Sequence, residues 1–325
     1  MRSWGFCVAI AAGAMAMPLL ASGGQPQKDA GLPPSAVQPA TAPAETLGFA
    51  DRASRMTVPV SVDGKGPYAF IVDTGAERSV VSRELADTLG LDAGARARLF
   101  DFAGSSTVNT VKVVSLTAGS LSTSAIEAPA LSAANLGASG MLGIDALQGH
   151  RVIVDFDHNR MTLAPAKRHA KGEIVMRAEA RLGQLIVTKA WFEGHPIDVV
   201  IDTGSWISVG NKAMLALAKR KPRSLGPITT YSVTGRSFDA DYVMINDVRI
   251  GDIKFDNFGL SFADAPPFAR LGLADKPALI LGMSSLKMFR RLEMDFVNRE
   301  IAFTLPRGPI NFHDTCRGVA NCKTL

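Results

Sequence analysis

Two acids in this 325-residue chain stand in almost the same short phrase. Asp73 lies in FIVDTGAERS, residues 70–79, and Asp202 lies in VVIDTGSWIS, residues 199–208. In each phrase an apolar run leads to the acid, then to threonine and glycine. A carboxylate at the end of a buried strand costs free energy unless it accepts hydrogen bonds, and glycine lets backbone N–H groups approach it. For a single Asp-Thr-Gly triplet, the alternative is that the Asp caps a helix from a tight turn before it.

The two triplets belong to a longer internal repeat. In each half a predicted hairpin, TVPVSV-DGKG-PYAFIV or LIVTKAWF-EGHP-IDVV, runs into the triplet. Helices with apolar residues at helical spacing are predicted over 82–90 and 211–220. A second shared phrase then follows, MLG in the first half and LILG in the second, with its glycine 70 residues after the first acid (73 to 143) and 80 after the second (202 to 282). Because order, type and spacing all recur, we interpret the chain as a duplicated domain.

Duplication changes the chemistry that the acids can perform. Two halves related by a pseudo-twofold axis can bring equivalent loops face to face, so that Asp73 and Asp202 share one proton. One carboxyl group then acts as a base and the other as an acid. Such a pair can activate a water, attack a carbonyl and protonate a leaving amine without a covalent intermediate. Its titration belongs to the pair.

The two acidic phrases, with MLG at 141–143 and LILG at 279–282, resemble those of bilobal aspartic proteases of the retropepsin-like kind, in an exported, bacterial-type form. The resemblance covers residues 50–306 and implies an all-β fold of two pseudo-twofold-related lobes with a few short helices. It implies that the apolar-apolar-Gly strands pass behind the acidic loops. The residues with an implied role are the catalytic pair Asp73 and Asp202, the loop-locking threonines Thr74 and Thr203, and the glycines beside the carboxylates, Gly75 and Gly204.

The family also covers its bound peptide with β-hairpin flaps. The candidates are RLFDFAGSSTVNTVKVV, with its turn near Gly104, and TTYSVTGRSFDADYVMI, with its turn near Gly235. Each segment alone fits an ordinary surface hairpin equally well, and their equivalent positions in the two halves favour flaps. The first half lacks the Tyr-Gly flap pattern of pepsins, so the resemblance leans towards a fused retropepsin pair.

The residue after each triplet differs between the halves, Ala76 in the first and Ser205 in the second. A serine hydroxyl at that place can stabilise an ionised carboxylate. Its absence beside Asp73 predicts a higher pKa for the pair, and activity at milder pH than in pepsin-like enzymes. Of the next residues, Trp206 is expected to pack in the core and Arg78 to pair with a nearby acid.

The N-terminus carries a secretory signal pattern, one Arg and an apolar stretch followed by small residues, although an uncleaved anchor is the alternative. The next segment is rich in Pro, Ala and Gln and is predicted to be a flexible tether. The expected organisation is a signal peptide over 1–22, a flexible linker over 23–47, an N-terminal lobe over 48–165, a C-terminal lobe over 172–306 and a tail over 307–325.

Export to an oxidising compartment would allow the cysteines to form a disulfide. Cys7 falls within the signal, and the remaining pair, Cys316 and Cys322, is predicted to close a disulfide that ties down the tail. A metal site that recruits His313 is the alternative, but its ligand spacing is loose.

Other chemistries find no support in the sequence. The formal charge of +5 is spread along the chain without a basic run, so no nucleic-acid partner is expected. Asp155, Asp157 and Asn159 resemble the start of a calcium loop that lacks its glycine and glutamate. No phosphate-cradling loop or nucleophile elbow occurs. We therefore predict no cofactor and no metal.

The sequence predicts a periplasmic or secreted aspartic endopeptidase that hydrolyses peptide or protein substrates with Asp73 and Asp202. Because both acids lie in one chain, a monomer is expected to suffice, with no stable membrane association after signal cleavage. The alternative is an exported, non-catalytic peptide-binding or regulatory protein with the same fold. Two intact triplets favour the enzyme, because a binder does not need both acids.

Overall fold

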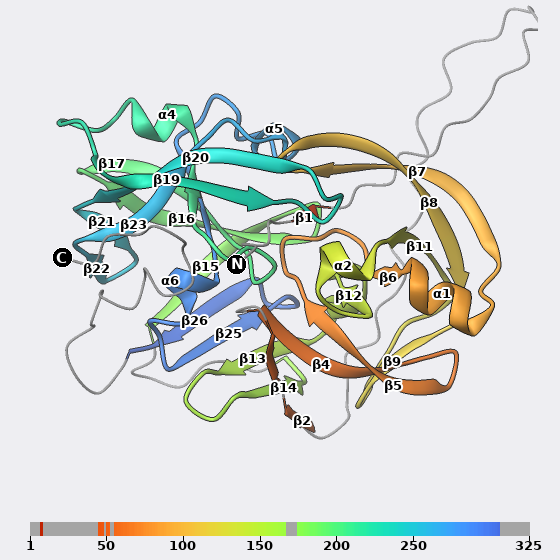
Figure 1. The fold of residues 1–325 in the computed structure, drawn as a ribbon. Helices are drawn as coiled ribbons and strands as arrows, with labels where there is room; N and C mark the ends of the chain where they lie inside the picture. Colours follow the sequence, from red (N-terminus) through yellow and green to blue (C-terminus); the bar gives the residue numbers. More distant parts are fainter. Residues whose placement is uncertain (1–6, 9–44, 49, 53–54, 167–173, 306–325) are drawn as a thin grey trace, which may run out of the picture.

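The computed structural model describes residues 7–8, 45–48, 50–52, 55–166 and 174–305 (Figure 1). Strands dominate this part of the chain, and its helices are short, which confirms the predicted all-β class. The strands form an 11-stranded sheet in the first lobe and a 15-stranded sheet that contains the second lobe.

In the first lobe a hairpin leads into the first acidic loop, as the alternating apolar residues and the turn at 63–64 predict. The chain then makes a short helix, a long hairpin and a return strand that lies beside the first hairpin. Its elements are β4 (Arg55–Val62), β5 (Lys65–Val72), β6 (Val80–Ser82), α1 (Arg83–Leu89), β7 (Ala93–Asp101), β8 (Gly104–Val113), β9 (Leu116–Ala118), β10 (Leu121–Ser122), β11 (Ile126–Leu131), α2 (Ala133–Leu136), β12 (Gly140–Leu142) and α3 (Ile144–Leu147).

The second lobe repeats this order. Its elements are β16 (Gln184–Phe192), β17 (His195–Ile201), β18 (Val209–Gly210), α4 (Lys212–Leu215), β19 (Arg223–Tyr231), β20 (Ser237–Ile245), β21 (Val248–Ile250), β22 (Ile253–Phe255), β23 (Phe258–Phe262), α5 (Pro266–Arg270), β24 (Ala278–Leu281) and α6 (Met283–Leu286). In both lobes the return strand runs parallel to the strand that leads to the acid, β12 beside β5 and β24 beside β17. The duplication inferred from sequence is therefore also a duplication of topology.

The helix predictions succeed unequally. The helix predicted over 82–90 is present as α1, which Ser82 caps by accepting a hydrogen bond from Leu85 N–H. The helix predicted over 211–220 is wrong in length, because α4 ends at Leu215. Beyond it the chain tightens into i→i−3 hydrogen bonds, from Leu217 to Met214 and from Ala218 to Leu215.

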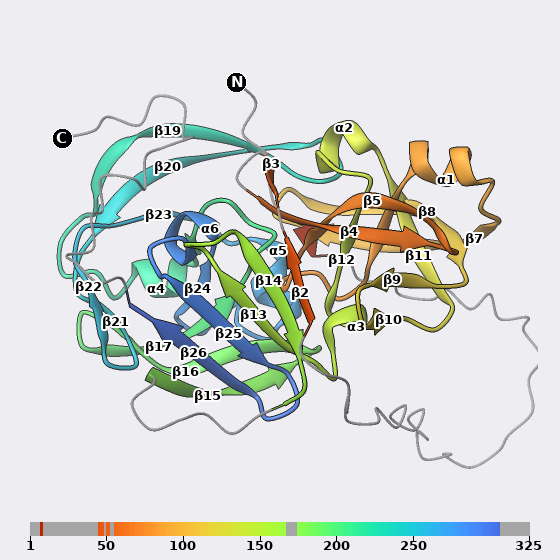
Figure 2. The ribbon, with the colours of Figure 1, turned by 90° about the horizontal axis from the view of Figure 1, so that it is seen from below.

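A layer of strands below the two acidic loops joins the lobes (Figure 2). Its strands are β2 (Glu45–Gly48), β13 (Arg151–Asp155), β14 (Arg160–Ala164), β15 (Ile174–Arg181), β25 (Arg291–Asp295) and β26 (Glu300–Thr304). The ends of the two halves, β13 and β25, pair antiparallel, with Arg151 opposite Asp295 and Asp155 opposite Arg291. Strands of the predicted first lobe thus belong to the same sheet as the second lobe.

Two short strands lie in segments predicted to be outside the fold. β2 begins at Glu45 and pairs with β14, so the linker predicted over 23–47 extends too far by a few residues. β1 (Cys7–Val8), within the predicted signal peptide, pairs antiparallel with the end of β7. A further short strand, β3 (Ala50–Arg52), pairs with β4.

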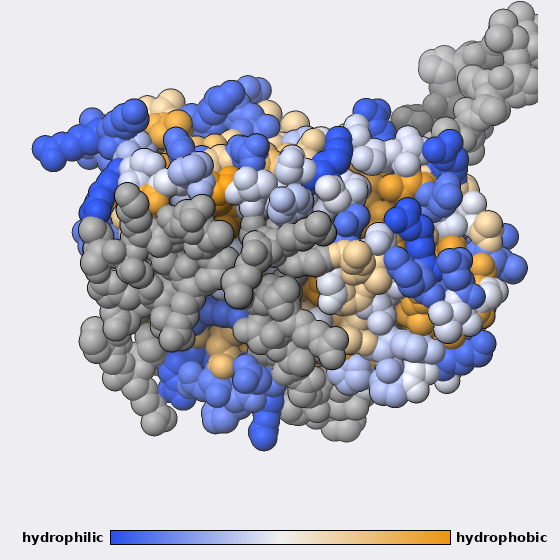
Figure 3. All heavy atoms as spheres, viewed as in Figure 1, coloured by the Kyte–Doolittle hydropathy of each residue, from blue (hydrophilic) through white to orange (hydrophobic). Residues whose placement is uncertain are grey.

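The largest apolar cluster runs through both lobes and the connecting layer. It includes fully buried Val58 in the first lobe, Val199 in the second, and Val152 and Leu292 in the strands that join them. Hydrophilic side chains are distributed over both lobes on the face shown in Figure 3. No helix in the described residues is long and apolar enough to cross a membrane.

Candidate active site

Each predicted acid lies in a buried loop at the end of the strand that precedes it. Asp73 follows β5 and Asp202 follows β17, and both side chains are 0% exposed. The N–H groups of Gly75 and Ala76 donate to Asp73 Oδ1 at 2.8 and 3.0 Å. The equivalent amides donate to Asp202 Oδ1 at 2.9 and 3.1 Å. Backbone donors therefore compensate part of the cost of burying each carboxylate.

The two threonines join the loops across the pseudo-twofold axis. Thr203 Oγ1 donates to the carbonyl of Val72 (2.7 Å) and accepts from Thr74 N–H (3.1 Å). Thr74 Oγ1 donates to the carbonyl of Ile201 (2.9 Å) and accepts from Thr203 N–H (3.2 Å). This reciprocal, buried network fixes the position of one loop relative to the other.

The glycines bring each loop against the opposite acid. A Cβ atom built on Gly75 would lie 2.6 Å from the carboxyl carbon of Asp202, and one on Gly204 would lie 2.1 Å from that of Asp73. Only glycine permits so close an approach. The structure thus brings together the six residues of the two triplets in one site.

Proximity and burial change the acidity of the pair. Burial raises the pKa of Asp202 well above its ordinary value, and the negative charge of Asp73 raises this pKa further, whereas the amides of Gly204 and Ser205 lower it. One member of the pair therefore retains a proton at a pH at which an exposed Asp is ionised.

The apolar-apolar-Gly strands support the loops from behind. Asp73 N–H donates to the carbonyl of Leu142 (2.9 Å), and Asp202 N–H donates to that of Leu281 (3.0 Å). A Cβ atom on Gly143 would lie 2.9 Å from the carbonyl oxygen of Ala76, and one on Gly282 would lie 3.0 Å from that of Ser205. The second shared phrase of the repeat therefore fits directly against the loop that follows each triplet.

The role expected for the Ser205 hydroxyl is wrong. Ser205 Oγ donates to the carbonyl of Ile207 (2.8 Å), because the loop places this acceptor two residues ahead. The contacts from Ala76 and Ser205 to the acids are equivalent, since each is a backbone N–H. The difference between the halves at this position therefore gives no direct hydrogen bond from Ser205 Oγ to Asp202.

The predicted flap turns lie at the ends of two long hairpins, β7–β8 and β19–β20 (Figure 1). Gly104 and Gly235 have φ values of 129° and 83°, a region that favours glycine, at these turns. We call the two hairpins the first flap (93–113) and the second flap (223–245).

The flap tips contact each other and the opposite lobes. Arg236 of the second flap lies 3.2 Å from the buried carboxylate of Asp101 in the first flap, and Thr234 Oγ1 donates to the same carboxylate at 2.7 Å. Phe102 joins an apolar cluster of the second lobe, and Val233 joins one of the first lobe. The two flap tips are therefore held together, and each packs against the opposite lobe.

Sequence reasoning missed two cross-lobe contacts. Gln184, at the start of β16, is 1% exposed and donates its side-chain N–H to the carbonyl of Gly75 at 2.6 Å. Glu77, four residues after Asp73, lies 3.7 Å from Arg270 of α5. Burial raises the pKa of Glu77 to about 7, and the charges of Arg270 and Arg78 oppose this rise. Gln184 and Arg55 stand at the same distance before their acids but differ in type, as do Glu77 and Trp206 after them, so comparison of the two repeats gave no signal for these contacts.

A third contact that we did not predict was detectable in the sequence. Ser79 and Ser208 both stand six residues after the acid, and their Oγ atoms accept from the N–H of Gly143 (3.1 Å) and Gly282 (3.0 Å). Alignment of the two repeats would have identified this pair, which ties each acidic loop to the strand behind it.

Other predicted residues have less to do with the acids. Trp206 is partly buried and packs against apolar clusters, as expected, with Lys287 over its ring at 5.4 Å. Cys316, Cys322 and His313 lie outside the described residues, so their disulfide stays a prediction. Within the described residues no three His, Cys, Asp or Glu side chains are grouped as metal ligands would be.

Comparison with known families agrees with this geometry. Residues 58–149 match the family model described as gag-polyprotein putative aspartyl protease, and residues 188–285 match the model described as aspartyl protease. Each half of the chain is an aspartyl protease domain. The first aspartyl protease domain contains Asp73 and the first flap, and the second contains Asp202 and the second flap.

A comparison with solved structures finds a resemblance on which no conclusion rests. The crystal structure of an aspartic proteinase from Irpex lacteus is similar at 13% sequence identity and a TM-score of 0.46, covering 81% of this chain and 98% of that chain. No curated protein sequence matches the chain. The matches to two aspartyl protease models, one per half, carry the assignment of a retropepsin/pepsin-like bilobal protein.

Proposed function

We propose that the protein is an aspartic endopeptidase in which Asp73 and Asp202 activate a water molecule. The observation that carries the proposal is the meeting of two buried carboxylates on equivalent loops, with the glycine of each loop placed directly against the acid of the other. A raised pKa for Asp202 supports it, because the pair can then hold one proton while the other carboxyl is ionised.

In this proposal the ionised carboxylate accepts a proton from the water as its oxygen attacks the carbonyl carbon of the substrate. The protonated carboxyl group donates its proton to the carbonyl oxygen. The tetrahedral intermediate then collapses: the carboxyl group that took the water proton gives it to the leaving amine, the C–N bond breaks, and the other carboxylate takes back a proton from a hydroxyl of the intermediate, which restores the pair. The threonine network keeps the two acids in place throughout, so that little reorganisation is needed.

The flaps supply the second requirement of such an enzyme, which is a cover that excludes bulk water. Their tips contact each other, and in this proposal a peptide chain displaces them to reach the acids. Both flaps and both acids come from one chain, and we propose a monomeric enzyme acting on peptide or protein substrates. The signal pattern in the sequence leads us to propose that it acts in the periplasm or outside the cell.

The test compares cleavage of a denatured protein by the wild type, Asp73→Asn and Asp252→Asn, at pH values from 3 to 8. The Asp252→Asn variant carries the same substitution in an exposed turn and serves as the control. We expect Asp73→Asn to lower the rate by about 10²–10⁴-fold and Asp252→Asn to leave it unchanged. If the wild type cleaves no faster than Asp73→Asn at any pH, the proposed peptidase function is wrong and the peptide-binding alternative is favoured.

A further inference from the structure

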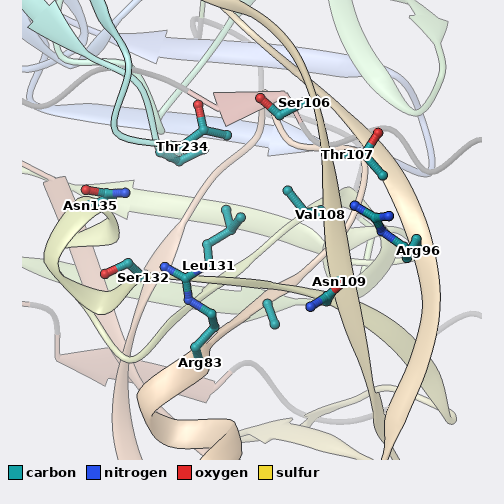
Figure 4. Close-up of a pocket in the computed structure, with 12 residues that line it drawn as sticks. Arg83, Arg96, Ser106, Thr107, Val108, Asn109, Leu131, Ser132, Asn135 and Thr234 are labelled. Carbon is teal, nitrogen blue, oxygen red and sulfur yellow. The ribbon is translucent and has the colours of Figure 1, made fainter.

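A cavity of about 320 Å³ is lined by residues of the first flap. The β7–β8 hairpin, the first residue of α1, the α2 segment and the tip of the second flap surround it (Figure 4). Its polar lining includes the side chains of Arg83, Arg96, Ser106, Ser132, Asn135 and Thr234.

Two positive charges face this cavity. Figure 4 shows Arg83 reaching in from the start of α1, while Arg96 enters from the hairpin on the other side. Among the described residues, no carboxylate lies within ion-pair distance of either guanidinium. The adjacent acid, Glu84, accepts hydrogen bonds from Ala133 N–H (2.8 Å) and Ser132 Oγ (3.2 Å). The lining therefore offers two guanidinium groups among neutral polar side chains, with Glu84 behind Ser132 and close enough to Arg83 to feel its charge.

An apolar cluster connects the cavity to the loop that carries Asp73. Leu131 and Val233 line it, and both belong to the apolar cluster that contains Ala76. Ala76 in turn donates its N–H to Asp73. A peptide stretched across the two acids advances about 3.3 Å per residue, so the position of a preferred acidic residue relative to the cleaved bond reports how far the cavity lies from the acids.

We propose that the cavity is a subsite for an acidic side chain of the peptide substrate, whose carboxylate is bound by Arg83 and Arg96. The planar guanidinium group suits a carboxylate because it offers paired N–H donors. The hydroxyl of Ser132 and the amide of Asn135 add neutral polar groups to the same lining. The inference rests on the proposed peptidase function and specifies its substrates as peptides with Asp or Glu near the cleaved bond.

The first experiment measures cleavage of a peptide library and then of matched peptides that differ only by Glu or Gln at the selected position. The enzymes are the wild type, Arg83→Gln, Arg96→Gln, their double variant, and Arg160→Gln as a control at the exposed first residue of β14. We expect a Glu preference of about tenfold in kcat/KM, lost in the double variant and kept in the control. No acidic preference in the wild type, or a preference that survives the double variant, would overturn the subsite.

The second experiment separates failure of the subsite from failure of the enzyme. Binding of the same peptide pairs, labelled with a fluorophore, is measured by anisotropy with Asp73→Asn, alone and combined with Arg83→Gln and Arg96→Gln. Tighter binding of the Glu peptide that depends on the arginines supports the subsite even if the wild type cleaves nothing. Equal binding of both peptides, or no binding, contradicts it.

A free acid distinguishes substrate recognition from binding of a small anion. N-acetylglutamate amide is titrated as a competitor of the Glu peptide and, separately, as a ligand of the protein alone. Competition with the Glu peptide that disappears in the double arginine variant supports the subsite. Arginine-dependent binding of the free acid with no Glu preference among peptides would overturn it, because the cavity would then be a small-anion site.

Discussion

Asp101 and Arg236 form an ion pair of 3.2 Å that connects the tip of the first flap to the tip of the second. The Asp101 carboxylate is fully buried, whereas the Arg236 side chain is 42% exposed. Thr234 Oγ1 and the N–H of Ala103 also donate to this carboxylate, at 2.7 and 2.9 Å. A buried carboxylate at the tip of the first flap is therefore paired with a cation from the other lobe.

This relationship predicts that Arg236→Gln loosens the flap tips. The substitution leaves the buried carboxylate without its cation, and loss of a charged hydrogen-bond partner typically costs about 1–3 kcal/mol. We expect amide hydrogen exchange at residues 102–104 and 233–236 to become faster, with little change elsewhere. Lys254→Gln, which removes an exposed ion-pairing cation in the β21–β22 hairpin, is the control. Unchanged exchange at the tips would show that the ion pair does not hold them.

The shared proton of the acid pair predicts a pH-dependent stability. Burial and the charge of Asp73 raise the folded-state pKa of Asp202, so its contribution to stability is present below its ordinary pKa and is lost as the pH rises through the raised value. Asn at this position still offers an acceptor to the N–H groups of Gly204 and Ser205 but cannot ionise. We expect Asp202→Asn to unfold at higher urea concentration than the wild type at pH 7, and at about the same concentration at pH 3. An equal shift at both pH values would rule out this linkage.

Glu77 provides a second titration at the boundary between the lobes. Its folded-state pKa of about 7 exceeds the ordinary value of 4.5, so its stabilising contribution is complete below about pH 4.5 and is lost as the pH approaches and passes 7. Glu77→Gln removes the ionisation, and we expect a gain of about 1–2 kcal/mol in the free energy of unfolding at pH 8 with almost none at pH 4. Urea titrations at the two pH values measure it. A loss of stability at pH 8 would instead mean that the ion pair with Arg270 outweighs the cost of burial.

Gln184 is predicted to position the first acidic loop. Its side-chain N–H donates to the buried carbonyl of Gly75, and Gln184→Leu would leave that carbonyl without this donor at a cost of about 1–3 kcal/mol. Because Gly75 lies against Asp202, we expect kcat for peptide cleavage to fall while KM changes little, together with a shift of the pH–rate profile. Gln148→Leu changes an exposed amide and is the control. A fall in stability with an unchanged kcat and pH profile would limit Gln184 to a structural role.

The repeat made much of this site predictable. Asp73 and Asp202, with the threonine and glycine after each, could be located because the same residues recur after the same apolar strands. Hairpins and the helix α1 followed from local patterns of turn residues and apolar spacing. The length of α4 could not be predicted in this way. The residues after Leu215 have the composition of a helix, but in the structure they form i→i−3 turns.

The sequence by itself determined the duplicated all-β architecture, the two acids and the two hairpins that became flaps, because each depends on local order that is written twice. Only the tertiary structure decided what meets across the axis. Gln184 reaches Gly75, Arg236 reaches Asp101, and Arg270 lies beside Glu77. The cross-lobe pairs join positions that are not equivalent in the two repeats, so no periodicity or alignment of the halves relates them. They exist because the packing of one lobe against the other brings unrelated side chains within hydrogen-bond distance.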